Sequence, residues 1–328
     1  MKLSVTTPVL SAALAMAVAA PASAALYAYD GVAYTAGNGD DNPALQLGDA
    51  PVALPDFDGG IGWAGAWHQL SGYDDVANSG LGSQRDDVQA RGFGGPVLDQ
   101  PSGLTVTNPG SDPATFQLKG TTRVARQMSS TVGGAGSTTY VGLSMEANDT
   151  TNNNIGIQLR SGGLQGTPVM SLWQEFPQDP NLGFPDILGI QAGDPYGTGN
   201  PDPADDVDNT GWDGFRNGSG RFYLLEILDD GVNATVSGKR FSSGDSLTGL
   251  PASWDFTGVA LPSFTFDSIA IFDNQAENDD QSIVWWDELR VANDINDFVN
   301  LTNPIPEPAS AVLLALGAGA ALTRRRSS

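Results

Sequence analysis

The sequence predicts an all-β protein, an antiparallel sandwich of the jelly-roll type. Apolar residues recur at every second position in several short stretches, and Asn, Asp and Gly cluster between those stretches. No apolar stripe with helical spacing extends beyond about ten residues. The acidic residues agree with this pattern, because 32 are aspartate and only 6 are glutamate. Aspartate favours turns over helix interiors.

The clearest alternation lies in the middle of the chain. Residues 141–145 alternate apolar and polar, and residues 155–159 do the same after an Asn-rich loop. This pattern predicts a hairpin with one buried face. Gly156, Gln158 and Arg160 fall on its polar side.

Further strands are expected towards the C-terminus. Residues 222–228 are almost continuously apolar, which predicts a central strand buried on both faces. An Asp-Asp-Gly turn leads from it into alternating residues 232–236. Residues 268–272 and 283–291 complete the expected set.

Both ends of the chain are expected to be targeting segments. Lys2, an apolar run and Ala22-Ser23-Ala24 predict a secretory signal peptide over residues 1–24. The sandwich is expected over residues 25–298, with an irregular Pro-, Gly- and Asp-rich insertion at about 174–220. Residues 299–305 are expected to be a linker, and residues 306–328 a sorting tail.

Charge and composition exclude several functions. The chain carries 38 acidic and 15 basic residues, a net charge of −23, which disfavours nucleic acid as a partner. There is no cysteine, so thiol chemistry is excluded, and a single histidine makes histidine-based triads improbable. No glycosidase motif or other catalytic constellation is present, so no catalytic residue is predicted.

The tail has three parts in a fixed order. The Pro306-Glu307-Pro308 triplet comes first, an uncharged run occupies residues 309–322, and Arg324, Arg325 and Arg326 follow. The run is rich in Ala and Leu and predicts a hydrophobic helix. As a helix it would reach about 21 Å, short of a hydrocarbon core of about 30 Å. A transient recognition segment is therefore favoured over a permanent anchor.

This tail resembles the PEP-CTERM sorting signal of Gram-negative bacteria. The resemblance implies that a membrane-embedded exosortase recognises Pro306, Glu307 and Pro308 and removes the tail. It also implies transit through the inner membrane to the cell surface or extracellular matrix, and a link to exopolysaccharide and biofilm.

Three motifs of the body carry a second resemblance. They are Tyr29-Asp30-Gly31, Gly62-Trp63-Ala64-Gly65-Ala66-Trp67 and Asp287-Glu288-Leu289-Arg290. Together they resemble concanavalin-like jelly rolls, and more narrowly the LamG-like ectodomains that often precede such sorting signals.

Asp287 is the most informative single residue. Strict alternation over residues 283–291 places Asp287 on the apolar face with Leu289, where a carboxylate needs hydrogen bonds or a cation. The resemblance implies a structural calcium ion held by Asp287, Asp30 and the carbonyl of Gly31. The alternative is that Asp287 accepts backbone N–H bonds or lies at a solvated strand edge. An acidic run at 202–208 is either a second calcium loop or a solvated loop.

Two tryptophans are candidates for stacking on sugars. Trp286 is expected on the exposed face with Glu288 and Arg290, and Trp212 lies in the polar insertion. The sequence thus predicts a non-catalytic surface or matrix protein that binds extracellular polysaccharide. The alternatives are a secreted polysaccharide hydrolase or lyase, and a structural surface protein without a small ligand.

Overall fold

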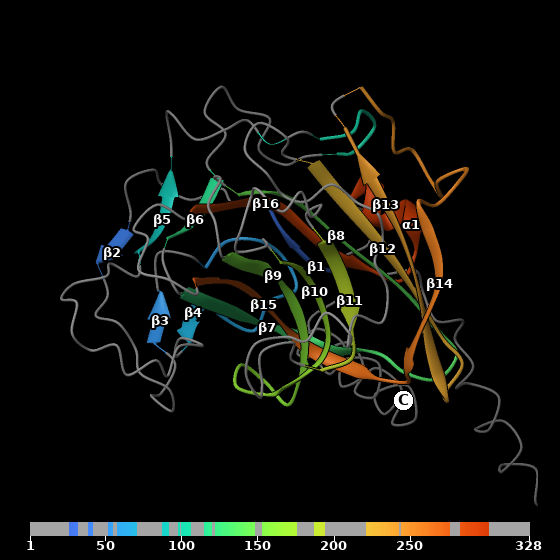
Figure 1. The fold of residues 1–328 in the computed structure, drawn as a ribbon, viewed down its shortest axis with the longest axis horizontal. Helices are drawn as coiled ribbons and strands as arrows, with labels where there is room; N and C mark the ends of the chain where they lie inside the picture. The colour runs from blue at the N-terminus through green and yellow to red at the C-terminus, as the bar shows by residue number, and fades with distance from the viewer. Residues whose placement is uncertain are drawn as a thin grey trace, which may run out of the picture.

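The computed structural model describes residues 26–31, 39–41, 52–54, 58–70, 87–91, 98, 100–105, 115–119, 122–147, 153–175, 187–193, 221–242, 244–275 and 283–301. Its strands form two antiparallel sheets, which are the two layers of a β-sandwich (Figure 1). The predicted all-β, jelly-roll sandwich is therefore confirmed.

Among the described residues, sheet A contains nine strands: eight in the order β14-β13-β12-β8-β16-β6-β5-β2, and β1, which pairs with β16. They are β1 (Leu26–Asp30), β2 (Gly39–Asp41), β5 (Asp87–Arg91), β6 (Thr115–Lys119), β8 (Ser137–Ala147), β12 (Arg221–Asp229), β13 (Asn233–Phe241), β14 (Phe256–Pro262) and β16 (Ile283–Ala292). The expected central strand is β12, which pairs with β8 on one side and with β13 on the other.

In the described part of the chain, sheet B contains seven strands in the order β11-β10-β9-β15-β7-β4-β3. They are β3 (Val52–Leu54), β4 (Trp67–Leu70), β7 (Thr122–Gly133), β9 (Asn153–Ser161), β10 (Thr167–Glu175), β11 (Ile187–Gln191) and β15 (Thr265–Gln275). The predicted hairpin between residues 141–145 and 155–159 is wrong, because β8 lies in sheet A and β9 in sheet B. Alternation shows which face of a strand is buried, but not which strand lies beside it.

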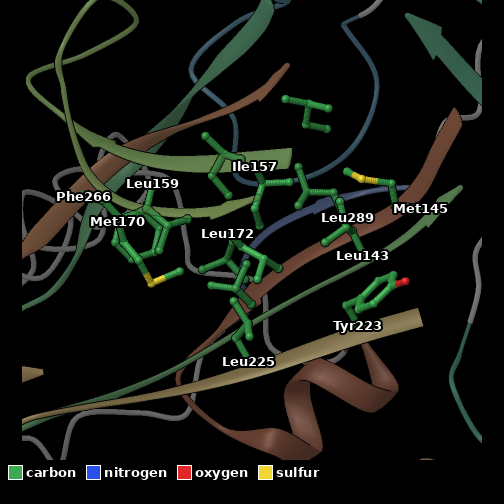
Figure 2. Packing of buried hydrophobic residues seen from close by; sticks show 14 of the residues in the cluster. Leu143, Met145, Ile157, Leu159, Met170, Leu172, Tyr223, Leu225, Phe266 and Leu289 are labelled. Carbon is green, nitrogen blue, oxygen red and sulfur yellow. The ribbon is translucent and has the colours of Figure 1, made fainter. Parts of the chain in front are cut away.

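The hydrophobic core fills the space between the sheets. Figure 2 shows Leu143 and Leu225 of sheet A lying near Ile157 and Leu172 of sheet B. All four side chains are at most 2% exposed. Each contributes about 1.5–3 kcal/mol by leaving water. The alternating pattern of the sequence therefore selects the inner face of each sheet.

A short helix covers part of the outer face of sheet A. Helix α1 (Ile295–Asn300) begins after Asp294, whose side chain accepts a hydrogen bond from the backbone N–H of Asn296 at 2.7 Å. Its Phe298 fits against Gly142 of β8, where an added Cβ would lie 2.5 Å from the ring. The predicted linker boundary is wrong here, because Val299 belongs to α1 and is 1% exposed.

Strand β16 contains a β-bulge that changes which residues face the core. Its pairing with β8 shifts between Asp287 and Arg290, and Glu288 has a φ of 55°. Val284 and Trp286 face the core before the bulge, and Leu289 and Val291 face it afterwards. The predicted single apolar face over residues 283–291 is therefore wrong.

The remaining predicted segments lie largely outside the described residues. Within 174–220, the described residues form the end of β10 and the apolar edge strand β11, and the rest of the predicted insertion lies outside the described residues. The signal peptide, the acidic run at 202–208 and the tail at 306–328 lie outside the described residues. Among the described residues, no helix has the length and apolarity needed to span a membrane.

Candidate functional site

The three motifs of the body meet at one place in the fold. Strand β1, with Tyr29 and Asp30, runs antiparallel to the second half of β16. The Gly-Trp segment crosses this pair, because Tyr29 and Ile61 exchange backbone hydrogen bonds of 2.9 and 2.8 Å. Trp63 donates its indole N–H to the Tyr29 carbonyl at 3.0 Å. We call the residues Tyr29, Asp30, Trp63, Trp67, Arg126, Asp287, Glu288 and Arg290 the motif cluster.

Asp30 joins the two sheets within the motif cluster. Its Oδ2 accepts a hydrogen bond from Nη1 of Arg126 on β7 at 2.7 Å, and another from Nε1 of Trp67 on β4 at 2.8 Å. Both Asp30 and Arg126 are 1% exposed. The Arg126 guanidinium also lies 4.9 Å from the ring of Trp63. Asp30 thus connects sheet A to sheet B.

Glu288 and Arg290 form a second buried ion pair, which holds the C-terminal end of the described chain. Glu288 accepts hydrogen bonds from Arg290 and, at 3.0 Å, from the hydroxyl of Tyr29. Arg290 Nη1 donates to the carbonyl of Phe298 at 2.8 Å. Arg290 therefore fixes α1 to β16.

Asp287 lies in the bulge and is 7% exposed. Its Oδ1 accepts the backbone N–H of Glu288 at 2.7 Å, which is the predicted alternative to a metal. Burial raises the pKa of Asp287 well above its usual range, and the charge of Glu288 raises that pKa further. Burial also raises the pKa of Glu288, against the opposing effect of Arg290.

The predicted calcium ligands do not fit a calcium ion. The carboxylate of Asp30 already faces the guanidinium of Arg126, so a cation is supplied by the chain itself. A Cβ added at Gly31 would overlap the Tyr29 hydroxyl and approach Glu288 Oε1, so Gly31 is closely packed against these two groups. Among the described residues, no three acidic, histidine or cysteine side chains gather in an arrangement that could hold a metal ion.

The predicted sugar-stacking role of Trp286 is wrong. Its side chain is 0% exposed, and its ring centroid lies 4.8 Å from that of Trp67 in the core. The bulge places Trp286 on the core side, whereas strict alternation places it outside. Trp212 lies outside the described residues. The motif cluster therefore has the character of a structural centre.

The outer face of sheet B has a different character, and its residues line up in three rows across the strands. The middle row, from β11 to β4, is Gln191, Ser171, Gln158, Ala270, Ala125 and His68. On one side lies the row Arg160, Ser268 and Gln127. On the other side lies the row Gly189, Trp173, Gly156, Phe272, Arg123 and Leu70. We call these three rows the outer face of sheet B.

This outer face concentrates hydrogen-bond donors and aromatic rings. Arg160 Nη1 donates to Oε1 of Gln158 at 2.6 Å, which orients the Gln158 amide. The Trp173 indole lies across Gly189, where an added Cβ would meet the ring at 3.1 Å. None of the residues in the three rows is acidic, and the adjoining row of the same face contains Glu175, in register with Ile187 and Asn154. Donors with aromatic surface are a combination suited to a polar organic ligand.

The outer face of sheet B is enclosed rather than open to solvent. Arg160 is 5% exposed, Arg123 8%, Trp173 1% and Gln158 0%. One described part of the cover is Leu164, in the turn between β9 and β10, which packs against Leu70, Ala125 and Ala270. That turn is held to β15, because Asp267 accepts the N–H of Gly163 at 2.9 Å and Ser268 donates to the Gly163 carbonyl at 2.8 Å.

Sequence reasoning missed this face as a site, although one signal for it was present. Alternation correctly placed Gln158 and Arg160 on the polar side of β9. It could not show that β15 and β7 lie beside β9, and therefore that Arg123 shares the same face.

Comparisons with known proteins find only distant structural likenesses. No protein-family model and no curated protein matches this chain. Among solved structures, the chain is similar to the CBM2 module of the Lactobacillus casei BL23 phage J-1 evolved Dit, with 11% identity, a TM-score of 0.36 and coverage of 83% of this chain and 96% of that one.

Two further solved structures have a similarly low identity and TM-score. The exoplasmic/lumenal domain of VIP36, in its Ca2+/Man3GlcNAc-bound form, is 10% identical with a TM-score of 0.32, covering 55% of this chain and 76% of that one. Alginate lyase Aly36B is 10% identical with a TM-score of 0.30, covering 55% and 80%. All three TM-scores are below 0.5, and these likenesses do not identify a ligand or a reaction for this chain.

Proposed function

We propose that this protein is an exported β-sandwich that binds a polysaccharide through the outer face of sheet B. The observation that carries the proposal is the alignment of Arg160, Gln158 and Trp173 on adjoining rows of one face. Sugars are bound by amide and guanidinium donors at their hydroxyls and by aromatic rings at their apolar faces. The outer face of sheet B provides both kinds of group.

The tail supplies the destination in this proposal. Its Pro306-Glu307-Pro308 motif, apolar run and Arg324–Arg326 triplet have the order of a signal read by an exosortase-type enzyme. The sandwich would then act at the cell surface or in the extracellular matrix, where polysaccharide is the available partner. Mass spectrometry of the mature protein tests this part, and an intact Arg324–Arg326 triplet on surface-located protein would contradict removal of the tail.

A ligand reaches the outer face of sheet B only if the side chains that cover it, including Leu164, move aside. Leu164 occupies the small-residue part of the middle row, over Ala125 and Ala270. Shortening this side chain opens that position without touching a donor. Leu164→Ala is therefore expected to bind glycan at least as tightly as the parent protein.

A glycan array with the purified protein tests the binding proposal. Binding is expected, and Trp173→Ala should weaken it roughly three- to tenfold, the range of an aromatic contact. Trp254→Ala is the matched control, because Trp254 packs on the hydrophobic cluster outside sheet A. A protein that binds no glycan, or a Trp173→Ala variant that binds as the parent does, would overturn the proposal.

The same samples separate the alternative functions. A reducing-sugar assay on each bound glycan detects turnover, which would favour a secreted polysaccharide hydrolase or lyase. Binding without turnover supports the non-catalytic function. Absence of any binding would favour a structural surface protein.

A further inference from the structure

We infer that the turn between β9 and β10 is a lid, which opens as a unit and admits the polysaccharide to the outer face of sheet B. This inference rests on the proposed function and adds how access to the same site is controlled. The turn consists of residues 162–166, which we call the lid. Its leucine, Leu164, packs against three side chains of the face: Leu70, Ala125 and Ala270.

Two hydrogen bonds hold the lid to strand β15, and both are made by Gly163. Its backbone N–H donates to Oδ1 of Asp267 at 2.9 Å, and its carbonyl accepts a hydrogen bond from the hydroxyl of Ser268 at 2.8 Å. We call these two bonds the latch. Because Asp267 and Ser268 are neighbours in β15, both bonds break together when Gly163 moves away from that strand. Water replaces the lost partners, so each bond favours the closed lid only about two- to tenfold.

Glycines at the two ends of the lid provide its hinges. Gly162 has a φ of 98°, a conformation that favours glycine. At the other end, a Cβ added at Gly166 would lie 2.2 Å from the carbonyl oxygen of Ser161, so this position also requires glycine. Within the lid, the N–H of Gly166 donates to the carbonyl of Gly163 at 2.9 Å. Because hinge motion is concentrated at a few residues at the ends of an element, the lid can open with this internal bond intact.

The lid covers polar groups that a polysaccharide can use. Gly163 lies over the row of Ser268 and Gln127, and a Cβ added to it would be 3.8 Å from the Gln127 amide. Ser268 is 0% exposed, so opening of the lid is what gives a ligand access to its hydroxyl. A sugar hydroxyl both donates and accepts hydrogen bonds, and it can therefore replace the N–H and the carbonyl of Gly163 on the latch. Such a ligand binds the open state and shifts the lid towards it.

Native-state hydrogen exchange of the full-length protein tests the opening without a ligand. The amide of Gly163 is expected to exchange at least about a hundredfold faster than the core amides of β9 and β15, with little dependence on added denaturant, as in a local opening. Ser268→Ala should accelerate this exchange about two- to tenfold, because it removes one bond of the latch. Ser263→Ala is the control. It removes a similar bond, from Ser263 to Asp229 at 3.0 Å, in a different turn and should leave Gly163 unchanged.

A disulfide provides a reversible lock, because the chain has no cysteine of its own. Leu164→Cys and Ala270→Cys are combined in one protein, since these positions pack in one cluster when the lid is closed. Leu164→Cys with Ala125→Cys is a second pair, and mass spectrometry identifies the pair that forms the disulfide. On the glycan array, the oxidised form is expected to bind at least about tenfold more weakly than the same protein after reduction. The parent protein treated with the same reductant is the control.

The outcomes separate the lid from the proposed function. Exchange of the Gly163 amide only through global unfolding would overturn the lid, whether or not a glycan binds. Equal glycan binding by the oxidised and reduced forms would overturn the lid and leave the proposed function intact. Absence of glycan binding by the parent, the reduced and the Leu164→Ala proteins would overturn the proposed function, and hydrogen exchange would still show whether the turn opens locally.

Discussion

The guanidinium of Arg126 in sheet B lies 2.7 Å from the carboxylate of Asp30 in sheet A, and both side chains are 1% exposed. This ion pair crosses the interior between the two layers. Removing one partner leaves an uncompensated buried charge, which costs about 3–5 kcal/mol. Arg126→Met and Asp30→Asn are each expected to lower the free energy of unfolding by about this amount, measured by denaturant titration.

A surface pair of similar length provides the control. Lys239 and Asp255 also lie 2.8 Å apart, but they are 25% and 29% exposed. Lys239→Met is expected to cost at most about 1 kcal/mol. The double variant of Arg126 and Asp30 should cost less than the sum of the two single variants. Additive losses, or a loss at Arg126 no larger than that at Lys239, would show that the buried pair has no special role.

The pKa of Asp287 predicts how stability depends on pH. This pKa is raised by burial, so the folded protein holds a proton that the unfolded protein releases. The resulting stabilisation is complete below the unfolded pKa, about 3.9, and is lost as pH rises through the folded pKa. The stability of the parent protein relative to Asp287→Asn should therefore fall as pH increases above about 4.

Asp230 is the control with the opposite sign. Backbone N–H groups of Asn233 and Val232 lower its pKa in the exposed turn after β12. The stability of the parent protein relative to Asp230→Asn should therefore fall as pH decreases below about 4. Thermal unfolding at a series of pH values measures both trends. If the difference in stability between Asp287→Asn and the parent protein is independent of pH, the raised pKa of Asp287 does not contribute to stability.

Helix α1 predicts that a truncation within it destabilises the protein. Val299 is 1% exposed, and the carbonyl of Phe298 accepts a hydrogen bond from the buried Arg290. A chain that stops after Phe298 loses the buried side chain of Val299, worth about 1.5–3 kcal/mol. It should be less stable than a chain that stops after Leu301 by at least this amount. Equal denaturation midpoints for the two chains would show that Val299 contributes nothing.

The sequence predicted the strands and their buried faces better than it predicted their neighbours. Ile157 and Leu159 face the core, and Gln158 and Arg160 face outward, as alternation requires. Alternation is a local property, so it placed β8 and β9 in one hairpin although they belong to different sheets. Pairing depends on contacts between distant residues.

The candidate sites show the same limit. The three motifs of the body do come together, but the partner of Asp30 is Arg126, which lies 96 positions away in the sequence and in no motif. Trp286 was misplaced because one extra residue in β16 reverses the alternation between its two halves, so a pattern in phase with Leu289 and Val291 puts Trp286 on the wrong face. This bulge depends on the left-handed backbone conformation of Glu288. Glutamate rarely adopts that conformation, so the residue type gave no sign of the bulge.

Glu288 itself gives the last prediction, because it has two opposing effects on stability. Its φ of 55° is unfavourable for a residue with a side chain, so glycine would relieve about 1 kcal/mol of strain. Its carboxylate, however, is the acidic partner of the buried Arg290 and accepts a hydrogen bond from Tyr29. Removing the partner of a buried charge costs about 3–5 kcal/mol, which is more than the relief of strain contributes.

Glu288→Gly should therefore be less stable than the parent protein by about 2–4 kcal/mol, as measured by denaturant titration. Glu288→Gln keeps the shape of the side chain and one acceptor oxygen but loses the charge. The decrease in its stability therefore measures the ion pair separately from the backbone strain. A Tyr29→Phe variant removes only the hydroxyl and should cost about 1 kcal/mol. If Glu288→Gly proved more stable than the parent, backbone strain would outweigh the ion pair, and the bulge would be maintained by the pairing of β16 with β1 and β8 instead.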